Sequence, residues 1–193
     1  HNNLGLIFQM LGENKKAINC FKKSIQIDPN YSSAYYNIAS LFHNMGDTKI
    51  AKNFYKKAIE LKPDYVEAYN NLGILCNQIN ENENSISYFK EAIDINSSYY
   101  DAYFNLALVF DKIGQSEKAI NSYEEAIKVN PTFSNAYNNL GILYKNEGKY
   151  QKAQECYEMA IKISPEFSDA YNNLGVILSD LGKTQDAIYN YSE

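Results

Sequence analysis

The chain has 193 residues, 45% of them hydrophobic, so it is long enough to bury a sizeable apolar core. Its net charge of −5 argues against a nucleic-acid groove, in which lysine and arginine cluster to neutralise phosphates, and no apolar run approaches the roughly 18 residues that cross a membrane. The cysteines Cys20, Cys76 and Cys156 are odd in number and include no CxxC pair, which indicates buried thiols in the cytoplasm or nucleus rather than a disulfide framework.

A period of 34 residues organises the whole sequence. A proline, replaced once by serine, recurs at Pro29, Pro63, Ser97, Pro131 and Pro165. A small residue recurs at Ala17, Ala51, Ser85, Ala119, Ala153 and Ala187. An aromatic residue recurs at Phe21, Tyr55, Phe89, Tyr123, Tyr157 and Tyr191. A glycine, replaced once by asparagine, recurs at Gly12, Gly46, Asn80, Gly114, Gly148 and Gly182. Because these columns keep one period without insertion or deletion, the sequence predicts a solenoid of stacked units.

In chain order, the units are a partial repeat, four full repeats and a truncated repeat, over 1–31, 32–65, 66–99, 100–133, 134–167 and 168–193. The repeat 66–99 is degenerate, because Asn80, Ser85 and Ser97 replace the glycine, alanine and proline of the other units. We therefore expect it to be the softest stretch, with the least protected amides. The sequence opens inside a first helix, from His1 to Leu11, and stops inside a second, so we interpret it as part of a longer protein.

Each unit is predicted to form two helices. In the fifth unit, the apolar residues predict a first helix from Ser134 to Glu147 and a second helix from about Tyr150 to Ile163. Gly148 supplies the left-handed conformation that ends the first helix, and Pro165 prevents the second helix from continuing. Since one such hairpin cannot bury its own apolar face, neighbouring units must stack on each other.

Short polar residues after the proline position are predicted to cap the first helices: Asn30, Asp64, Ser98 and Thr132. Asp64 with Glu67, and Ser98 with Asp101, have the spacing of a capping box. The carboxylates of Glu67, Asp101 and Asp169 have a second interpretation, since they could also attract a basic segment of a ligand.

One column of residues carries a family resemblance: Tyr137, Leu140, Gly141, Tyr144, Ala153, Tyr157, Ala160 and Pro165. This column resembles the tetratricopeptide repeat pattern, with tyrosine in place of its usual first tryptophan, and the resemblance covers essentially the whole chain. It implies an all-α fold, an alpha-alpha superhelix of 34-residue helix-turn-helix repeats whose first helices line a concave face. It also implies a role in binding other polypeptides.

Asparagine occupies one position of every unit: Asn3, Asn37, Asn71, Asn105, Asn139 and Asn173. A carboxamide has one acceptor and two donors, so it can bind both the C=O and the N–H of a passing backbone. Packed helices lie about 8–10 Å apart, which matches three residues of an extended chain at roughly 3.3 Å each. We therefore predict a peptide-binding ladder for extended or disordered polypeptide segments. The alternative, that each amide satisfies local backbone groups, stays open.

A second motif narrows the resemblance. The junction reads Pro-x-aromatic-x-x-Ala-Tyr-x-Asn-Leu-Gly in Pro131 to Gly141 and in Pro165 to Gly175. It resembles the repeat arm of nucleocytoplasmic protein O-glycosyltransferases, most closely the SPINDLY branch, whose members transfer fucose or another sugar to Ser or Thr. The resemblance implies that the groove asparagines hold substrate backbone and that a glycosyltransferase domain belongs to the parent protein. The aromatic residue of the motif has a second interpretation, as packing between repeats.

The residues themselves contain no nucleophile–base set, no phosphate-binding glycine loop and no metal-ligand spacing, so the chain is predicted to be non-catalytic, without cofactor or metal. His43 is interpreted as a surface histidine. No cation precedes the asparagine column, at Tyr36, Asn70, Phe104, Asn138 and Asn172, which argues against a carboxylate clamp. The open ends of the array would permit a homodimer or end-to-end stacking. The alternative function is a scaffold in a multiprotein assembly with no link to glycosylation.

Overall fold

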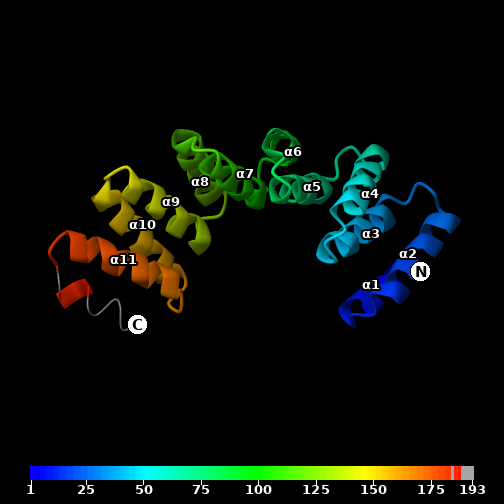
Figure 1. Ribbon diagram of the computed structural model, residues 1–193, viewed down its shortest axis with the longest axis horizontal. Helices are drawn as coiled ribbons and strands as arrows, with labels where there is room; N and C mark the ends of the chain where they lie inside the picture. Colours follow the sequence, from blue (N-terminus) through cyan, green and yellow to red (C-terminus); the bar gives the residue numbers. More distant parts are fainter. Residues whose placement is uncertain (184, 188–193) are drawn as a thin grey trace. The chain divides into compact units, whose positions relative to one another are not determined.

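The computed structural model describes residues 1–183 and 185–187, and over these residues it contains helices and turns but no strand (Figure 1). The first helices of the hairpins are α1 (Asn2–Met10), α3 (Ser32–Asn44), α5 (Val66–Gln78), α7 (Tyr100–Lys112), α9 (Ser134–Asn146) and α11 (Ser168–Asp180). The second helices are α2 (Asn14–Ile27), α4 (Thr48–Leu61), α6 (Asn82–Ile95), α8 (Ser116–Val129) and α10 (Tyr150–Ile163). The all-α prediction is confirmed, and both predicted helices of the fifth unit are confirmed to within one residue.

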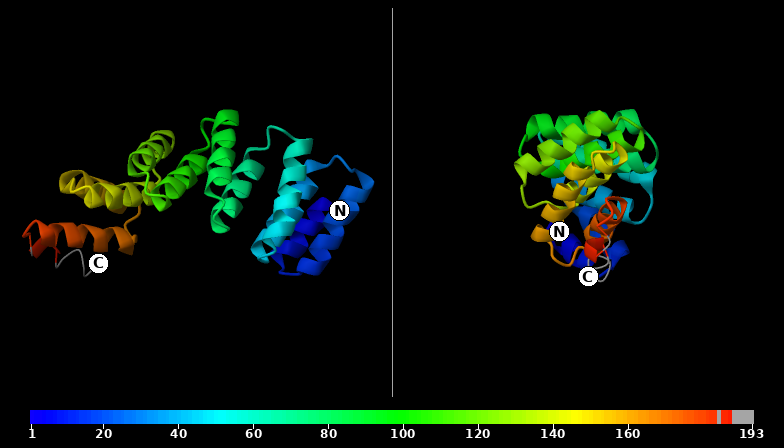
Figure 2. Two further views of the ribbon diagram at one scale, coloured as in Figure 1. Left: turned by 45° about the horizontal axis from the view of Figure 1, so that its top comes forward. Right: turned by 90° about the vertical axis from the view of Figure 1, so that its left-hand side faces the viewer.

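The chain forms two compact units, His1–Ser97 with α1 to α6 and Ser98–Glu193 with α7 to α11. Within each unit, consecutive helices pack as antiparallel hairpins, and the second helix of one hairpin packs on the first helix of the next (Figure 2). In the first unit these junctions are α2 with α3 and α4 with α5, and in the second they are α8 with α9 and α10 with α11. Residues far apart in the sequence therefore meet at every junction.

The recurring aromatic residue of the second helix is the centre of each hairpin core. Phe21, Tyr55, Phe89 and Tyr157 are completely buried, and Tyr123 almost so. The facing first helix carries a glycine or alanine, because a larger side chain would meet the ring. A Cβ atom added to Gly73 would lie 2.6 Å from the Phe89 ring, and one added to Gly141 would lie 2.6 Å from the Tyr157 ring. The alternation of small and large residues thus sets the helix spacing.

The predicted left-handed turn residue is confirmed, with a φ of +73° at Gly148 and similar values at the other glycines of the column. Asn80 adopts the same conformation, with a φ of 60°, and is the single non-glycine residue with positive φ among the described residues. Asparagine tolerates this region better than other side chains do, so the degenerate repeat keeps the same turn.

The predicted helix caps are wrong. The residues that precede the first helices are the aromatics Tyr31, Tyr65, Tyr99 and Phe133, and none of them makes a side-chain cap hydrogen bond. The residue after the proline lies one position before this aromatic residue, in the turn between the helices. In two of these turns its backbone N–H donates to the side chain that precedes the proline: Asn30 to Asp28 Oδ1 at 3.0 Å, and Thr132 to Asn130 Oδ1 at 3.1 Å.

The expected capping boxes at Asp64, Ser98 and their partners are therefore also wrong. Glu67, Asp101 and Asp169 lie instead in the first turns of α5, α7 and α11, where a carboxylate is favourable next to the positive end of the helix dipole.

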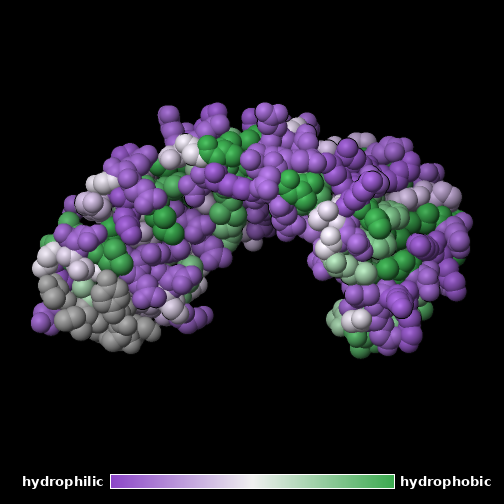
Figure 3. All heavy atoms as spheres, in the orientation of Figure 1, coloured by the Kyte–Doolittle hydropathy of each residue, from purple (hydrophilic) through white to green (hydrophobic). Residues whose placement is uncertain are grey.

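The surface in Figure 3 is mainly hydrophilic, with hydrophobic residues in small groups. Two apolar side chains of α1 are exposed although the equivalent residues of the next repeat are buried. Leu4 and Ile7 are 45% and 53% exposed, whereas their equivalents Ile38 and Leu41 on α3 are buried under α2. No helix within the described residues is both long and apolar enough to span a membrane.

Candidate peptide-binding face

The six asparagines of the predicted ladder all lie on first helices. Asn3 is exposed, and the other five, Asn37, Asn71, Asn105, Asn139 and Asn173, are half-buried. Asn37, Asn71 and Asn173 each donate to the residue 35 positions earlier on the first helix of the preceding hairpin. The asparagines of the ladder therefore lie where two successive hairpins pack against each other.

In the first unit, two asparagines donate to the preceding first helix. The Asn37 Nδ2 donates to Asn2 Oδ1 at 2.9 Å, and the Asn71 Nδ2 donates to the Tyr36 hydroxyl at 2.9 Å. Burial, together with the nearby carboxylate of Glu67, raises the pKa of Tyr36. Tyr36 thus keeps its proton at neutral pH and accepts the amide N–H as a neutral hydroxyl.

In the second unit, the amides form a chain across three helices. The Asn173 Nδ2 on α11 donates to Asn138 Oδ1 on α9 at 2.9 Å, and the Asn138 Nδ2 makes a long 3.5 Å contact with Asn139 Oδ1. The Asn139 Nδ2 in turn donates to the Tyr123 hydroxyl on α8 at 3.3 Å. The residue 35 positions before Asn139 is Phe104, whose side chain has no acceptor, and the Asn139 amide donates to the second helix instead.

These contacts refine both interpretations of the asparagine column. In Asn37, Asn71, Asn139 and Asn173 the amide partners are side chains of the preceding hairpin, rather than the local backbone groups that the alternative proposed. Each bond uses one of the two N–H groups of the carboxamide. The amides are therefore held in place by the stacking of hairpins.

Two sets of residues at these junctions were not predicted from the sequence. One is the residue before the asparagine, such as Asn2, Tyr36 or Asn138, and the other is the tyrosine hydroxyl of the second helix. The signal that could have found the first set is the 35-residue separation between polar residues on successive first helices.

Aromatic side chains surround the asparagine junctions. The Tyr36 ring lies 4.9 Å from the Tyr65 ring, and the Phe104 ring lies 4.8 Å from the Phe133 ring, measured between centroids. Tyr65 and Phe133 are the aromatic residues of the proline junction, so their interpretation as packing between repeats agrees with these contacts. Tilted rings at this separation stabilise the junction beyond their buried area.

Other candidate groups have ordinary partners. The ring of His43, interpreted as a surface histidine, pairs with Gln78 Oε1 at 2.8 Å. Burial raises the pKa of the Cys76 thiol to about 11 and of the Cys156 thiol to about 12, so both stay protonated and unreactive. Over 1–183 and 185–187, no group of three or more His, Cys, Asp or Glu side chains could hold a metal ion.

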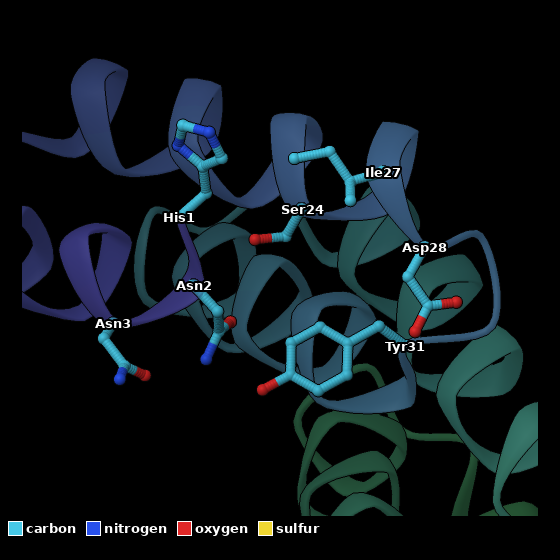
Figure 4. A pocket seen from close by; sticks show the side chains of 7 residues that line it. All are labelled: His1, Asn2, Asn3, Ser24, Ile27, Asp28 and Tyr31. Atoms are coloured by element: carbon cyan, nitrogen blue, oxygen red, sulfur yellow. The ribbon is translucent and has the colours of Figure 1, made fainter.

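A pocket of about 380 Å³ lies at the start of the first unit (Figure 4). Its lining residues are His1, Asn2, Asn3, Ser24, Ile27, Asp28 and Tyr31. Asn2, Ser24 and Tyr31 come from α1, α2 and the loop after α2, and lie around one opening. The pocket borders the first residue of the chain, so His1 itself forms one wall.

Family models agree with the repeat pattern. Models of the tetratricopeptide repeat match residues 32–65, 134–167 and 156–189, and a further TPR repeat model matches 5–46 and 110–148. A model of the Est1 DNA/RNA binding domain matches residues 51–120. Carboxylates outnumber lysines in that stretch, so it has the helical hairpins but not the cationic surface that nucleic acid requires. A comparison with curated protein sequences gives no match.

Solved structures with a similar fold include MamA, with 30% identity, a TM-score of 0.77, and coverage of 84% of this chain and 95% of that chain. The Pseudomonas aeruginosa pilF protein has a TM-score of 0.87 at 21% identity, covering 98% of this chain and 86% of that one. YrrB, described as a TPR protein with an unusual peptide-binding site, has a TM-score of 0.71 at 24% identity, covering 88% of each chain. The last two likenesses show the fold alone.

Proposed function

Because the chain belongs to the tetratricopeptide repeat family and is a protein–protein interaction scaffold, we propose that it captures an extended polypeptide on the face of its first helices. The observation that carries this proposal is the asparagine column, which is half-buried in five successive first helices. Four of these amides donate a hydrogen bond to the preceding hairpin. These hydrogen bonds restrict the amides to a few arrangements at the junctions before a ligand binds, which lowers the entropy that binding costs.

The chemistry of the column suits backbone recognition. A carboxamide that donates one N–H to its neighbour has, by count, a second N–H and a carbonyl oxygen with which to meet a peptide group. Backbone groups are common to all polypeptides, so such contacts would accept many sequences. Selectivity would then come from the half-buried apolar residues one turn further along the same helices: Ile74, Leu108, Ile142 and Val176.

The free energies of hydrogen bonding and of association set the expected affinity for a peptide. Each hydrogen bond contributes about 0.5–1.5 kcal/mol net, whereas association costs about 4–15 kcal/mol. The asparagines alone would therefore give weak and short-lived binding. This strength suits a surface that samples many polypeptides rather than one that holds a permanent partner.

The test replaces Asn71, Asn105 and Asn139 together with alanine. The probe is a Gly-Ser dodecapeptide, which offers backbone groups but no large side chain, and binding is followed by NMR shifts that detect millimolar affinity. We expect the Kd to rise at least about tenfold, since three backbone contacts are lost. Alanine is the best helix former, so the first helices should remain intact.

The matched control replaces Asn53 and Asn121, which occupy one exposed position of two second helices, and should leave the Kd unchanged. Undiminished binding in the triple variant would show that the column does not hold peptide. The favoured function would then be a scaffold that binds a folded or helical partner.

A narrower hypothesis makes this face the substrate arm of a SPINDLY-like protein O-glycosyltransferase in the cytoplasm or nucleus, delivering Ser/Thr-rich segments to a catalytic domain. Its support is the junction motif of 131–141 and 165–175. None of the similar structures named above carries the name of a glycosyltransferase. The decisive observation is the full-length sequence: a nucleotide-sugar-binding α/β domain beyond the repeats supports the hypothesis, and a parent protein without one ends it.

A further inference from the structure

The tyrosines of the second helices meet the asparagine column in an unexpected way. Each asparagine of the column from Asn37 onward lies 16 residues after the aromatic residue of the preceding second helix, as in the hydrogen-bonded pair Tyr123 and Asn139. The same spacing relates Tyr55 to Asn71 and Tyr157 to Asn173. The column therefore contains three tyrosine–asparagine pairs, and two pairs in which the aromatic residue is Phe21 or Phe89.

Two of the three tyrosine hydroxyls are buried without a hydrogen bond. The hydroxyls of Tyr55 and Tyr157 are inaccessible to solvent and find no partner of normal geometry among the described residues. Burial raises the pKa of both tyrosines, and the side chains of Ser40 and Asn71 lie near enough to the Tyr55 hydroxyl to oppose that rise. A buried hydroxyl without a partner destabilises a fold, so its presence at two equivalent positions calls for a reason.

The third pair shows what these hydroxyls can do. The Tyr123 hydroxyl accepts the Asn139 N–H, because Phe104 on the preceding first helix offers no acceptor. In the other two pairs the preceding first helix does offer one, and the amide donates there instead: Asn71 to Tyr36, and Asn173 to Asn138. The asparagine column thus shows two arrangements of the amide. In the lateral arrangement it donates to the preceding first helix, and in the other it donates to the tyrosine of the preceding second helix.

The two arrangements present different groups to a ligand. Nδ2 and Oδ1 diverge from Cγ, so an amide whose Nδ2 points at the buried hydroxyl directs its carbonyl oxygen elsewhere; in Asn139 this oxygen makes only the long 3.5 Å contact with Asn138 Nδ2 and has a second lone pair. That oxygen can then accept a backbone N–H from a bound peptide. In the lateral arrangement, Nδ2 donates to the preceding first helix instead, as in Asn71 and Asn173.

We propose that the buried hydroxyls of Tyr55, Tyr123 and Tyr157 are positioning residues for the asparagine ladder, and that a bound peptide selects the arrangement in which each amide donates to its tyrosine. This inference rests on the proposed function. It assigns a role to Tyr55 and Tyr157 in which the hydroxyl gains its hydrogen bond when ligand binds. Asn139 is already in that arrangement, so it is the pre-set contact of the second unit.

The experiment replaces Tyr55 and Tyr157 together with phenylalanine, a residue that the same column holds at Phe21 and Phe89. Two quantities are measured: the urea midpoint of unfolding and the Kd for the Gly-Ser dodecapeptide. We expect the midpoint to rise, because two unpartnered buried hydroxyls are removed, while the Kd rises about two- to tenfold for each lost hydroxyl. A hydroxyl that only strained the core would raise the midpoint and leave the Kd unchanged, so a higher Kd together with a higher midpoint indicates a positioning role.

Two further variants complete the test. Tyr123→Phe should lower the urea midpoint, because it breaks a hydrogen bond that the free protein already makes. Tyr150→Phe, at an exposed tyrosine, should change neither quantity.

The outcomes separate this inference from the function on which it rests. If Tyr55→Phe with Tyr157→Phe raises the midpoint but leaves the Kd unchanged, while the asparagine-to-alanine variant loses binding, the inference is overturned and the proposed function stands. If the asparagine-to-alanine variant binds the dodecapeptide as the wild type does, or the wild type does not bind it, both are overturned.

Discussion

The repeats 66–99 and 134–167 build the same hairpin from different residues. Their first helices, α5 and α9, each have 13 residues, and their second helices, α6 and α10, each have 14. The turn between them has a φ of 60° at Asn80 in one and 73° at Gly148 in the other. The backbone after the second helix is also alike, with φ and ψ of −139° and 94° at Asn96, and of −129° and 90° at Ser164.

The degenerate repeat keeps this backbone because its unusual side chains find partners. Ser85, which replaces alanine, is completely buried and donates its hydroxyl to the Gly73 carbonyl at 2.8 Å. At the turn, Glu81 pairs with Lys52 of the preceding hairpin and accepts from Asn84 at 2.8 Å. The packing of the two helices therefore defines the repeat. A residue of the repeat pattern can be substituted when a new local contact replaces the interaction that the usual residue makes.

The largest expected effect is common to both repeats and tests that conclusion. Phe89→Ala and Tyr157→Ala each empty the centre of a hairpin core and should destabilise the chain by about 3–5 kcal/mol. Urea unfolding followed by circular dichroism measures the loss. If one repeat tolerated its substitution with less than about 1 kcal/mol, the aromatic residue would not be the shared centre of the hairpins.

Amide hydrogen exchange should separate the two repeats. The lost proline and the left-handed asparagine both favour the unfolded chain in 66–99, so we expect its helices to open with about 1–2 kcal/mol less free energy than those of 134–167. This corresponds to exchange that is roughly 5–30-fold faster. Mass-spectrometric exchange of the intact chain measures it, and equal protection of α6 and α10 would contradict the prediction.

A single substitution should reduce the difference in amide-exchange rate between the two repeats. Ser97→Pro restores the proline column at a place where the preceding residue, Asn96, already has the extended conformation that proline requires. We expect stabilisation by about 0.4–1 kcal/mol through the unfolded state, seen as slower exchange in α6. The reverse change, Pro165→Ser, is the matched control and should speed exchange in α10 by a similar factor.

The serine in the core of the degenerate repeat should matter less. In Ser85→Ala, the Gly73 carbonyl loses the hydroxyl but keeps its place within helix α5, so no buried group is left without a partner. We expect a change in the free energy of unfolding of less than about 1 kcal/mol, because an apolar group of similar shape replaces the hydroxyl. A larger loss by urea unfolding would show that the serine hydroxyl anchors α6 to α5.

Residues whose effect is local could be predicted from the sequence, and those that act between hairpins could not. Gly148 and Pro165 end their helices through their own backbone, so both limits of the fifth unit were predicted. The caps failed because an aromatic residue that packs across a junction, such as Tyr65, takes the position before the helix. The asparagine column was visible as a pattern, but its partners depend on how one hairpin sits on the next.

The smallest expected effect concerns pH and the turn of the degenerate repeat. The hydrogen bond from Lys52, followed by that from Asn84, lowers the pKa of Glu81 from its usual value of 4.5. A carboxyl whose pKa is lower in the folded state stabilises the fold above its unfolded pKa, and this contribution is lost as the pH falls through the folded value. Acid below the usual range of glutamate should therefore loosen this turn selectively.

The equivalent position of the repeat 134–167 is Lys149, which pairs with Glu147 two residues away and ties no hairpin to its neighbour. Amide exchange of Glu81–Asn84 at neutral pH and at a pH below the folded pKa, compared with the turn around Gly148, measures the selectivity. Glu81→Gln removes the titrating group and should make the two turns respond alike. The same acid response in this variant would place its origin elsewhere in the chain, and the ion pair with Lys52 would then have no part in holding the degenerate repeat together.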